Sequence, residues 1–268
     1  MSLNTVKKIG PVLDLFTPEQ PEWRMTDIAR ALNTPKSSAH ALVSTLAEIG
    51  LLSVGPSGRY RLGLGLLSLS ERVRASLDIP RYAIPTMQEL ARTTRETVLL
   101  ATLDRHEVVY IDRVEGMHPA VRLAGVRPGS RVPAHCTACG KVLLAFRETD
   151  EVRELMAASN FRRFTPTTIT DMDALEQELV KVRARGIAFD REEVVRGISC
   201  MAVPIMDRYD AVIAGMSLSL PAYRMPPPGS QPAEALIKAL AAAAQTVSAR
   251  VANAESNVPE PDWITTVA

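Results

Sequence analysis

Residues 25–61 of the chain read MTDIARALNTPKSSAHALVSTLAEIGLLSVGPSGRYR and decide the fold of its N-terminal part. Two amphipathic patterns follow each other here, at residues 27–32 and 35–49, with a short polar turn between them. We expect Thr26 to cap the first helix and Gly50 to end the second. Two short helices joined by a tight turn predict a helix-turn-helix motif.

The second predicted helix of this motif has two different faces. Its apolar residues recur at helical spacing, and these are Ala39, Leu42, Val43, Leu46 and Ile49. The residues that face away from them are Ser37, His40, Ala41 and Ser44. Such a helix packs with one face and can enter a DNA major groove with the other.

Residues 51–63, LLSVGPSGRYRLG, predict two short strands joined by a turn at residues 55–58. The returning strand carries basic side chains for phosphate or the minor groove, which predicts a winged helix-turn-helix. A helical hairpin with a solvated polar face is the alternative. The candidate DNA-contacting residues are Thr26, Lys36, Ser37, Ser38, His40, Ser44, Arg59, Tyr60 and Arg61.

The composition excludes several classes of protein. The chain has 268 residues, is 46% hydrophobic and carries a net charge of only +1. The charge is uneven, because residues 1–75 hold nine basic and six acidic side chains. No signal stretch is visible, and no apolar run reaches the roughly 20 residues of a membrane helix. Three cysteines argue against a disulfide framework, so we expect a cytoplasmic protein that is not bound to a membrane.

The pattern along the chain predicts two domains and a connecting helix. We expect a winged helix-turn-helix DNA-binding domain at 1–63, a linker helix at 64–79, an α+β domain at 80–254 and a disordered tail at 255–268. A first helix over 3–15 packs through Val6, Ile9, Val12 and Leu13, with Phe16 just beyond it. The linker has more leucine than one small domain needs, which predicts a dimer.

The second domain alternates between strand and helix patterns. Residues 97–104 and 107–115 predict a hairpin, and further strands are expected at 120–124, 186–190, 199–206 and 212–220. Helices are expected at 85–93, 137–146, 151–158, 171–185 and 231–254. The mixture predicts an α+β fold.

Residues 128–145, PGSRVPAHCTACGKVLLA, concentrate His135, Cys136 and Cys139 at a strand-to-helix turn. One interpretation is a cysteine-dependent enzyme with His135 and Cys136 as its pair. A second is a metal or redox sensor that adds Cys200. A third is a ligand pocket in which the unpaired N–H groups of a helix start bind an anion. Simple burial of the thiols and of the histidine is the remaining alternative.

Three polar residues further along the chain are candidates for the same pocket. Ser217 and Ser219 lie two residues apart in a predicted strand, so their hydroxyl groups share one face. They need partners, which a polar ligand or backbone carbonyls would supply. Asp190 stands at a strand end, either as a ligand contact or as a turn former.

Together these motifs make the chain resemble an IclR-family transcriptional regulator over residues 3–250. The resemblance rests on residues 26–52 (the helix pair), 58–63 (GRYRLG), 135–141 (HCTACGK), 189–207 (FDREEVVRGISCMAVPIMD) and 217–221 (SLSLP). It implies a winged helix joined by a linker helix to a GAF-like or profilin-like effector domain. It also implies dimers or tetramers that control catabolic operons in response to small organic acids.

The resemblance implies a set of effector contacts and no cofactor. Polar contacts fall on Ala138 and Cys139 at the helix start, and on Asp190, Cys200, Ser217 and Ser219. The apolar wall consists of Val121, Ala124, Val132 and Ile198. We therefore expect a DNA-binding repressor that responds to a carboxylic acid and is not an enzyme. Binding of an acid beside Asp190 requires that this carboxyl be protonated, hold a hydroxyl group or share a cation.

The chain also departs from the family pattern at three positions. Ala41 follows His40 where an arginine is frequent, which removes one expected DNA contact. Phe189 replaces a frequent tyrosine and lacks its hydroxyl. Cys139 adds a thiol where many members have a small residue, which keeps metal or redox sensing as an alternative.

Overall fold

A computed structural model describes residues 4–117 and 126–255. Contacts divide the chain into two compact units, Met1–Leu77 and Asp78–Ala268. No helix in the described ranges carries an apolar stretch long enough to cross a membrane.

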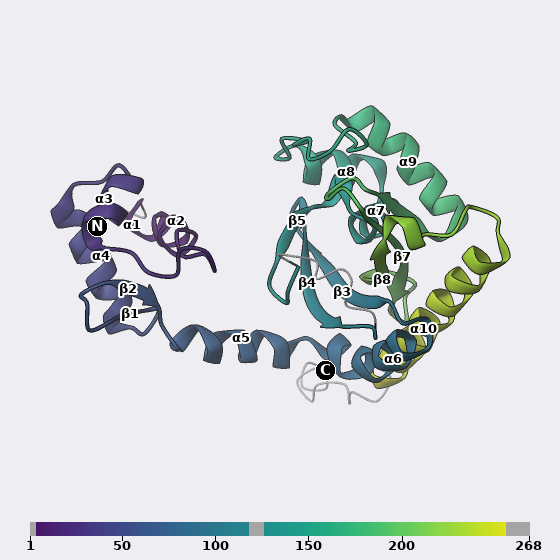
Figure 1. Cartoon of the computed structure of the whole chain (residues 1–268), viewed down its shortest axis with the longest axis horizontal. Helices are drawn as coiled ribbons and strands as arrows, with labels where there is room; N and C mark the ends of the chain where they lie inside the picture. The colour runs from purple at the N-terminus through teal and green to yellow at the C-terminus, as the bar shows by residue number, and fades with distance from the viewer. Residues whose placement is uncertain (1–3, 118–125, 256–268) are drawn as a thin grey trace, which may run out of the picture. The chain divides into compact units, whose positions relative to one another are not determined.

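The N-terminal unit contains the expected order of helix, turn, helix and wing (Figure 1). Its elements are α1 (Asn4–Lys7), α2 (Ile9–Leu13), α3 (Met25–Ala31), α4 (Lys36–Glu48), β1 (Leu52–Val54), β2 (Tyr60–Leu62) and α5 (Gly65–Ser76). Gly50 follows α4 with φ of +78°, a conformation that glycine adopts without strain, and so ends the helix as predicted. Strands β1 and β2 pair antiparallel around the turn at residues 55–58.

Local details of this unit differ from the expectations. The predicted capping role of Thr26 is wrong, because α3 begins at Met25 and Arg24 occupies the N-cap position without a side-chain cap. The single first helix is wrong as well, since α1 and α2 are separate and Val6 is 63% exposed. Ile49 lies beyond the end of α4 and is 59% exposed, so it is not part of the packing face.

The core of this unit is small and joins the helices to the wing. Its buried members are Val12, Phe16, Ile28, Leu42, Val43, Leu46, Leu52 and Tyr60. Trp23 adds a feature that the periodicity did not indicate: it forms an antiparallel bridge with Tyr60, with N–H to carbonyl distances of 2.9 and 2.8 Å. Since Tyr60 is 8% exposed, its ring faces the core.

The C-terminal unit has the predicted α+β composition. Its helices are α6 (Asp78–Thr94), α7 (Ala138–Ala145), α8 (Thr149–Met156), α9 (Met172–Arg185) and α10 (Gln231–Glu255). Its strands are β3 (Thr97–Asp104), β4 (Glu107–Val114), β5 (Arg131–Pro133), β6 (Ala188–Arg191), β7 (Ile198–Met206) and β8 (Val212–Pro221). Short 3-10 turns lie at Ala134–Cys136 and Ala222–Arg224.

The six strands form one antiparallel sheet in the order β5-β4-β3-β8-β7-β6. Alternate residues of the central strands point to opposite faces, and both faces are buried. Helices α6 and α10 cover one face, and α7 packs on the other with α9 against it (Figure 1). Polar residues on the α7 face are therefore held inside the unit.

Three parts of the C-terminal unit differ from the predicted elements or lie outside the described residues. The helix expected at 85–93 begins at Asp78, because Pro80 suits its first turn. Strand β5 was not predicted, since three residues are too short for a period-2 pattern. The strand predicted at 120–124 lies outside the described residues, and so does the predicted tail apart from its first residue, at the end of α10.

Candidate functional site

Helix α4 presents a polar face to solvent in the N-terminal unit. Ala39, Leu42, Val43 and Leu46 are buried, whereas Lys36, Ser37, Ser38 and His40 are exposed and Ser44 is half-buried. Thr26 is also exposed, and it lines a hollow of about 750 Å³ together with Arg30, Thr34 and Lys36. Short hydroxyl side chains and a lysine on one helix face suit close approach to base edges and phosphates.

The wing supplies two basic side chains beside this helix motif. Arg61 is exposed, and its Nε donates a hydrogen bond to Ser53 Oγ at 3.1 Å, while Arg59 is half-buried. Tyr60, between them, faces the core, as alternation along a strand requires. We therefore assign the Tyr60 ring to the fold and leave it out of the proposed DNA contacts.

In the C-terminal unit, β-sheet register brings the polar candidates into one row. Asp190 in β6 is opposite Cys200 in β7, Cys200 is opposite Ser219 in β8, and Ser219 is opposite Thr97 in β3. Ser217 lies two residues earlier on the same face and is 2% exposed, against 3% for Ser219. Cys200 Sγ lies 3.3 Å from Ser219 Oγ.

The start of α7 meets this row. Thr137 caps the helix, with its hydroxyl accepting the N–H of Gly140 at 2.9 Å. A side chain on Gly140 would collide with the Ala134 carbonyl, 2.2 Å from the Cβ position, so glycine permits this close turn. The N–H groups of Ala138 and Cys139 lie between this cap and Gly140 and have no hydrogen bond to another described residue. Two donors at the positive end of a helix suit an anion.

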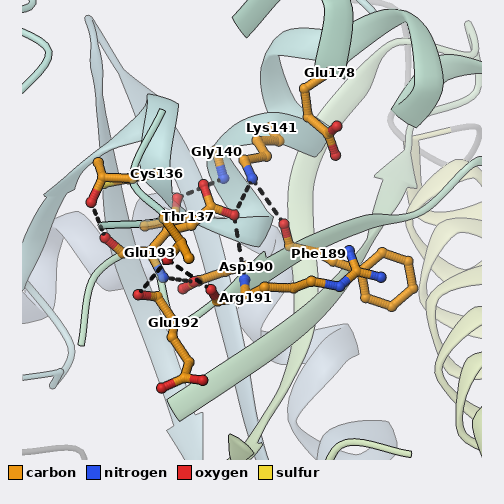
Figure 2. A network of polar contacts seen from close by, with 12 residues as sticks. Cys136, Thr137, Gly140, Lys141, Glu178, Phe189, Asp190, Arg191, Glu192 and Glu193 are labelled. Carbon is orange, nitrogen blue, oxygen red and sulfur yellow. Dashed lines mark hydrogen bonds and ion pairs between the residues drawn. The ribbon is translucent and has the colours of Figure 1, made fainter. Parts of the chain in front are cut away.

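A buried ion pair, which the sequence pattern did not indicate, lies beside this row. Lys141 of α7 points toward the loop after β6, where its Nζ lies 2.5 Å from Glu193 Oε1 and 2.9 Å from the Phe189 carbonyl (Figure 2). All eight residues of α7 are buried. A lysine in so apolar a helix requires a buried partner of opposite charge. The lone lysine among the apolar residues of this helix was therefore the feature of the sequence that could have indicated the ion pair. Glu193 Oε2 is buried without a hydrogen bond to any described residue.

Asp190 has an unusual ionisation equilibrium. Burial raises its pKa to about 7, against the opposing effects of the Glu193 N–H, which donates to Oδ1 at 2.7 Å, and of Lys141. A large fraction of Asp190 is therefore protonated at neutral pH. An ionised Asp190 would repel a bound carboxylate, whereas the protonated carboxyl group can donate a hydrogen bond to it.

The enzyme and metal interpretations of the HCTAC turn find little support in the geometry. The Nε2 of His135 lies 3.3 Å from the Arg162 carbonyl, and Cys136 Sγ donates to the Pro133 carbonyl. Burial raises the pKa of the Cys136 and Cys139 thiols to about 12, so neither is an activated nucleophile. No group of three or more potential ligands is placed to hold a metal ion within residues 4–117 and 126–255.

The apolar wall is only partly visible. Val132 in β5 and Ile198 in β7 are half-buried and pack against the core beneath α7. Val121 and Ala124 lie outside the described residues. Of the ten predicted effector contacts, the eight described ones thus lie on or beside the α7 face of the sheet.

A winged helix-turn-helix followed by an α+β unit with a buried polar face defines a DNA-binding transcriptional regulator with a C-terminal sensory domain. Residues 5–56 match the model of the IclR helix-turn-helix domain, and residues 72–249 match that of the bacterial transcriptional regulator IclR C-terminal domain. The chain belongs to the IclR family, as its motifs indicated.

Individual relatives agree with this membership. The chain is 37% identical to the HTH-type transcriptional regulator XynR of Escherichia coli, over 81% of this chain and 86% of that protein. It is 31% identical to the HTH-type transcriptional repressor AllR of Klebsiella pneumoniae, over 76% and 74%. A crystal structure of an IclR homolog from Microbacterium hydrocarbonoxydans, complexed with 4-hydroxybenzoate, matches with a TM-score of 0.78 at 28% identity, covering 93% of this chain and 99% of that one.

Proposed function

We propose that this protein is a cytoplasmic repressor of a catabolic operon, not an enzyme, and that it binds a small carboxylic acid as its effector. Residues 1–63 contact an inverted-repeat operator, residues 64–79 link the domains and residues 80–254 bind the acid. The observation that carries the proposal is the row of Asp190, Cys200 and Ser219 beneath the N-terminus of α7, in a chain that also exposes the polar face of α4. A relative named as a repressor supports the sign of regulation.

The proposed DNA contacts follow from exposure. Lys36, Ser37, Ser38, His40 and Ser44 of α4 enter the major groove, Arg59 and Arg61 of the wing contact phosphate or the minor groove, and Thr26 contacts the backbone. The chain has Ala41 where related proteins often have an arginine, which removes one DNA contact. The operator sequences of relatives therefore do not carry over to this protein.

The proposed oligomer is a dimer, or a tetramer built from dimers, that uses the linker helix. Helix α5 buries none of its own residues in the single chain. Leu64 at its N-cap and the leucine and valine side chains within it are far more exposed than apolar side chains usually are: Leu64 80%, Leu67 64%, Leu69 45% and Val73 60%. A second copy that covers them would place two recognition helices on half-sites about one helical turn, roughly 34 Å, apart.

The effector site follows from the same row of residues. The N–H groups of Ala138 and Cys139 and the hydroxyl groups of Ser217 and Ser219 donate to the carboxylate, with Asp190 protonated or bound to a hydroxyl group of the acid. Cys200 completes the polar row, and Val121, Ala124, Val132 and Ile198 line the apolar part. The acid shifts DNA binding only through unequal affinity for the DNA-bound and free states of the protein.

Fluorescence anisotropy of the full-length protein tests this function. DNA from upstream of its own gene is compared with a scrambled duplex over a salt series. We expect saturable preference for the upstream DNA and its loss on addition of an acid. Equal weak binding to both duplexes contradicts regulation from this site. Acid binding that persists in Ser217→Ala/Ser219→Ala contradicts the effector site.

A further inference from the structure

Tyr110 of β4 lies on the same face of the sheet as the serine pair, although it is remote from it in sequence. Strands β4, β3, β8 and β7 lie side by side (Figure 1). Tyr110 is opposite Ala101 in β3, and Ala101 is opposite Gly215 in β8. Gly215 precedes Ser217 by two residues, so it shares the face that α7 covers.

The residues between Tyr110 and the polar row are small. Ala101 has one methyl group and Gly215 has none, and Cys139 of α7 lies directly above Gly215, with its Sγ 3.4 Å from the Cβ position there. The thiol of Cys139 donates to the Gly215 carbonyl, with its Sγ 3.8 Å from that oxygen. The short side chain of Ala101 leaves room beside Tyr110 for its ring, whereas Cys139 fills the space above Gly215.

Packing places the Tyr110 side chain near the start of α7. It belongs to the same buried cluster as Ala134, Ala138 and Cys139. Strand β4 is two strand spacings from β8, about 9–10 Å at the usual 4.7–4.9 Å per spacing. A tyrosine side chain spans most of that distance, so an acid bound beneath α7 can contact both Ser217 and the Tyr110 hydroxyl group.

The hydroxyl group has no partner among the described residues. Tyr110 is 7% exposed, and its backbone is paired, through its N–H to the Ser130 carbonyl at 3.0 Å and through its carbonyl from the Gly129 N–H at 2.8 Å. No hydrogen bond between described residues involves its Oη. Buried tyrosine hydroxyl groups usually find a partner. Burial raises the pKa of Tyr110 well above its usual value, so at neutral pH the group is a neutral donor.

The charges near Asp190 suggest a role for the neutral hydroxyl group of Tyr110. The cation beside Asp190 is Lys141, and its ammonium group already binds Glu193 and the Phe189 carbonyl. Since this ammonium group is already paired, a neutral donor adds to the binding of an anion beside Asp190. We propose that Tyr110 is a further effector contact, whose hydroxyl group donates a hydrogen bond to an oxygen of the bound acid. This inference rests on the proposed function of the C-terminal domain.

Isothermal titration calorimetry on the full-length protein tests the role of Tyr110, with pyruvate and 4-hydroxybenzoate as the two probes. The variants are Tyr110→Phe, the control Tyr223→Phe at a position 82% exposed, and Ser217→Ala/Ser219→Ala. We expect one probe at least to bind the wild type, and Tyr110→Phe to raise its Kd about tenfold, as loss of a hydrogen bond to a charged group does. Tyr223→Phe leaves Kd unchanged.

A second measurement separates binding from folding. Without acid, the Tm of Tyr110→Phe should equal that of the wild type, because the hydroxyl group has no partner to lose among the described residues. A clear loss of Tm in Tyr110→Phe would assign the hydroxyl group to the fold and overturn the inference. If Kd is unchanged in Tyr110→Phe but binding is lost in Ser217→Ala/Ser219→Ala, the inference about Tyr110 is overturned. The proposed effector site is then supported. Failure of both probes to bind the wild type overturns both.

Discussion

Lys141 Nζ and Glu193 Oε1 lie 2.5 Å apart, in an ion pair whose side chains are only 2% and 7% exposed. The two residues are 52 positions apart in sequence, and their contact ties α7 to the loop that follows β6. That loop also holds the Glu193 N–H that binds Asp190. The ion pair thus fixes the two elements that carry the proposed effector contacts.

Breaking this pair should destabilise the C-terminal unit strongly. Lys141→Met leaves Glu193 buried without its cation, and we expect a loss of about 3–5 kcal/mol in the free energy of unfolding. The double variant Lys141→Met/Glu193→Leu removes both charges and should regain most of that loss. Urea unfolding followed by circular dichroism measures both effects.

The exposed pair of Arg92 and Glu89 is the matched control. Its N···O distance is 2.6 Å, but its side chains are 69% and 60% exposed. Arg92→Met should be indistinguishable from the wild type in the same assay, because water screens this pair. Equal losses in Lys141→Met and Arg92→Met contradict the role of burial.

Asp190 should make the folded state less stable as the pH rises. Its pKa in the folded protein, about 7, lies above the ordinary value of 3.8. The stabilisation is therefore complete below about pH 4 and is lost as the pH rises through 7, with an upper limit of roughly 4 kcal/mol. Asp190→Asn cannot ionise, so its urea midpoint should fall less between pH 5 and 8. If the urea midpoints of the wild type and Asp190→Asn change in parallel between pH 5 and 8, Asp190 is ionised over that whole range and the prediction is wrong.

The wing arginines should contribute to DNA affinity through phosphate charge. Arg59→Ala/Arg61→Ala should weaken operator binding and reduce the slope of log K against log salt by up to about 2, because each lost phosphate contact contributes about 0.9. Tyr60→Phe is the control on the same strand, since its buried ring keeps its packing. Its affinity should stay within twofold. An unchanged salt slope in the double arginine variant contradicts the wing contact.

The thiols should react slowly in the folded protein. Burial raises the pKa of Cys136 and Cys139 to about 12, and also raises that of Cys200 well above its usual value. Alkylation by iodoacetamide at pH 7.5 should therefore be at least about tenfold slower in buffer than in urea, because thiolate is the reactive species. Fast alkylation of Cys136 in the folded protein would favour the cysteine-enzyme alternative.

Local patterns in the sequence predicted most elements of this fold. The apolar spacing of α4, the ending at Gly50 and the hairpin of β3 and β4 depend on residues that are neighbours in the chain. Alternation in β8 also placed Ser217 and Ser219 on one face correctly. The family membership came from the same short motifs.

Patterns among neighbouring residues were thus enough for most of the elements, for the family and for the candidate residues, but not for β5 or for the separate helices α1 and α2. Only the tertiary structure decided that Tyr60 turns to the core beside Trp23, that Lys141 meets Glu193, and that Tyr110 shares a face with the serines. Helix and strand periodicity depends on neighbouring dihedral angles, whereas these contacts depend on strand register and on the packing of α7 across the sheet.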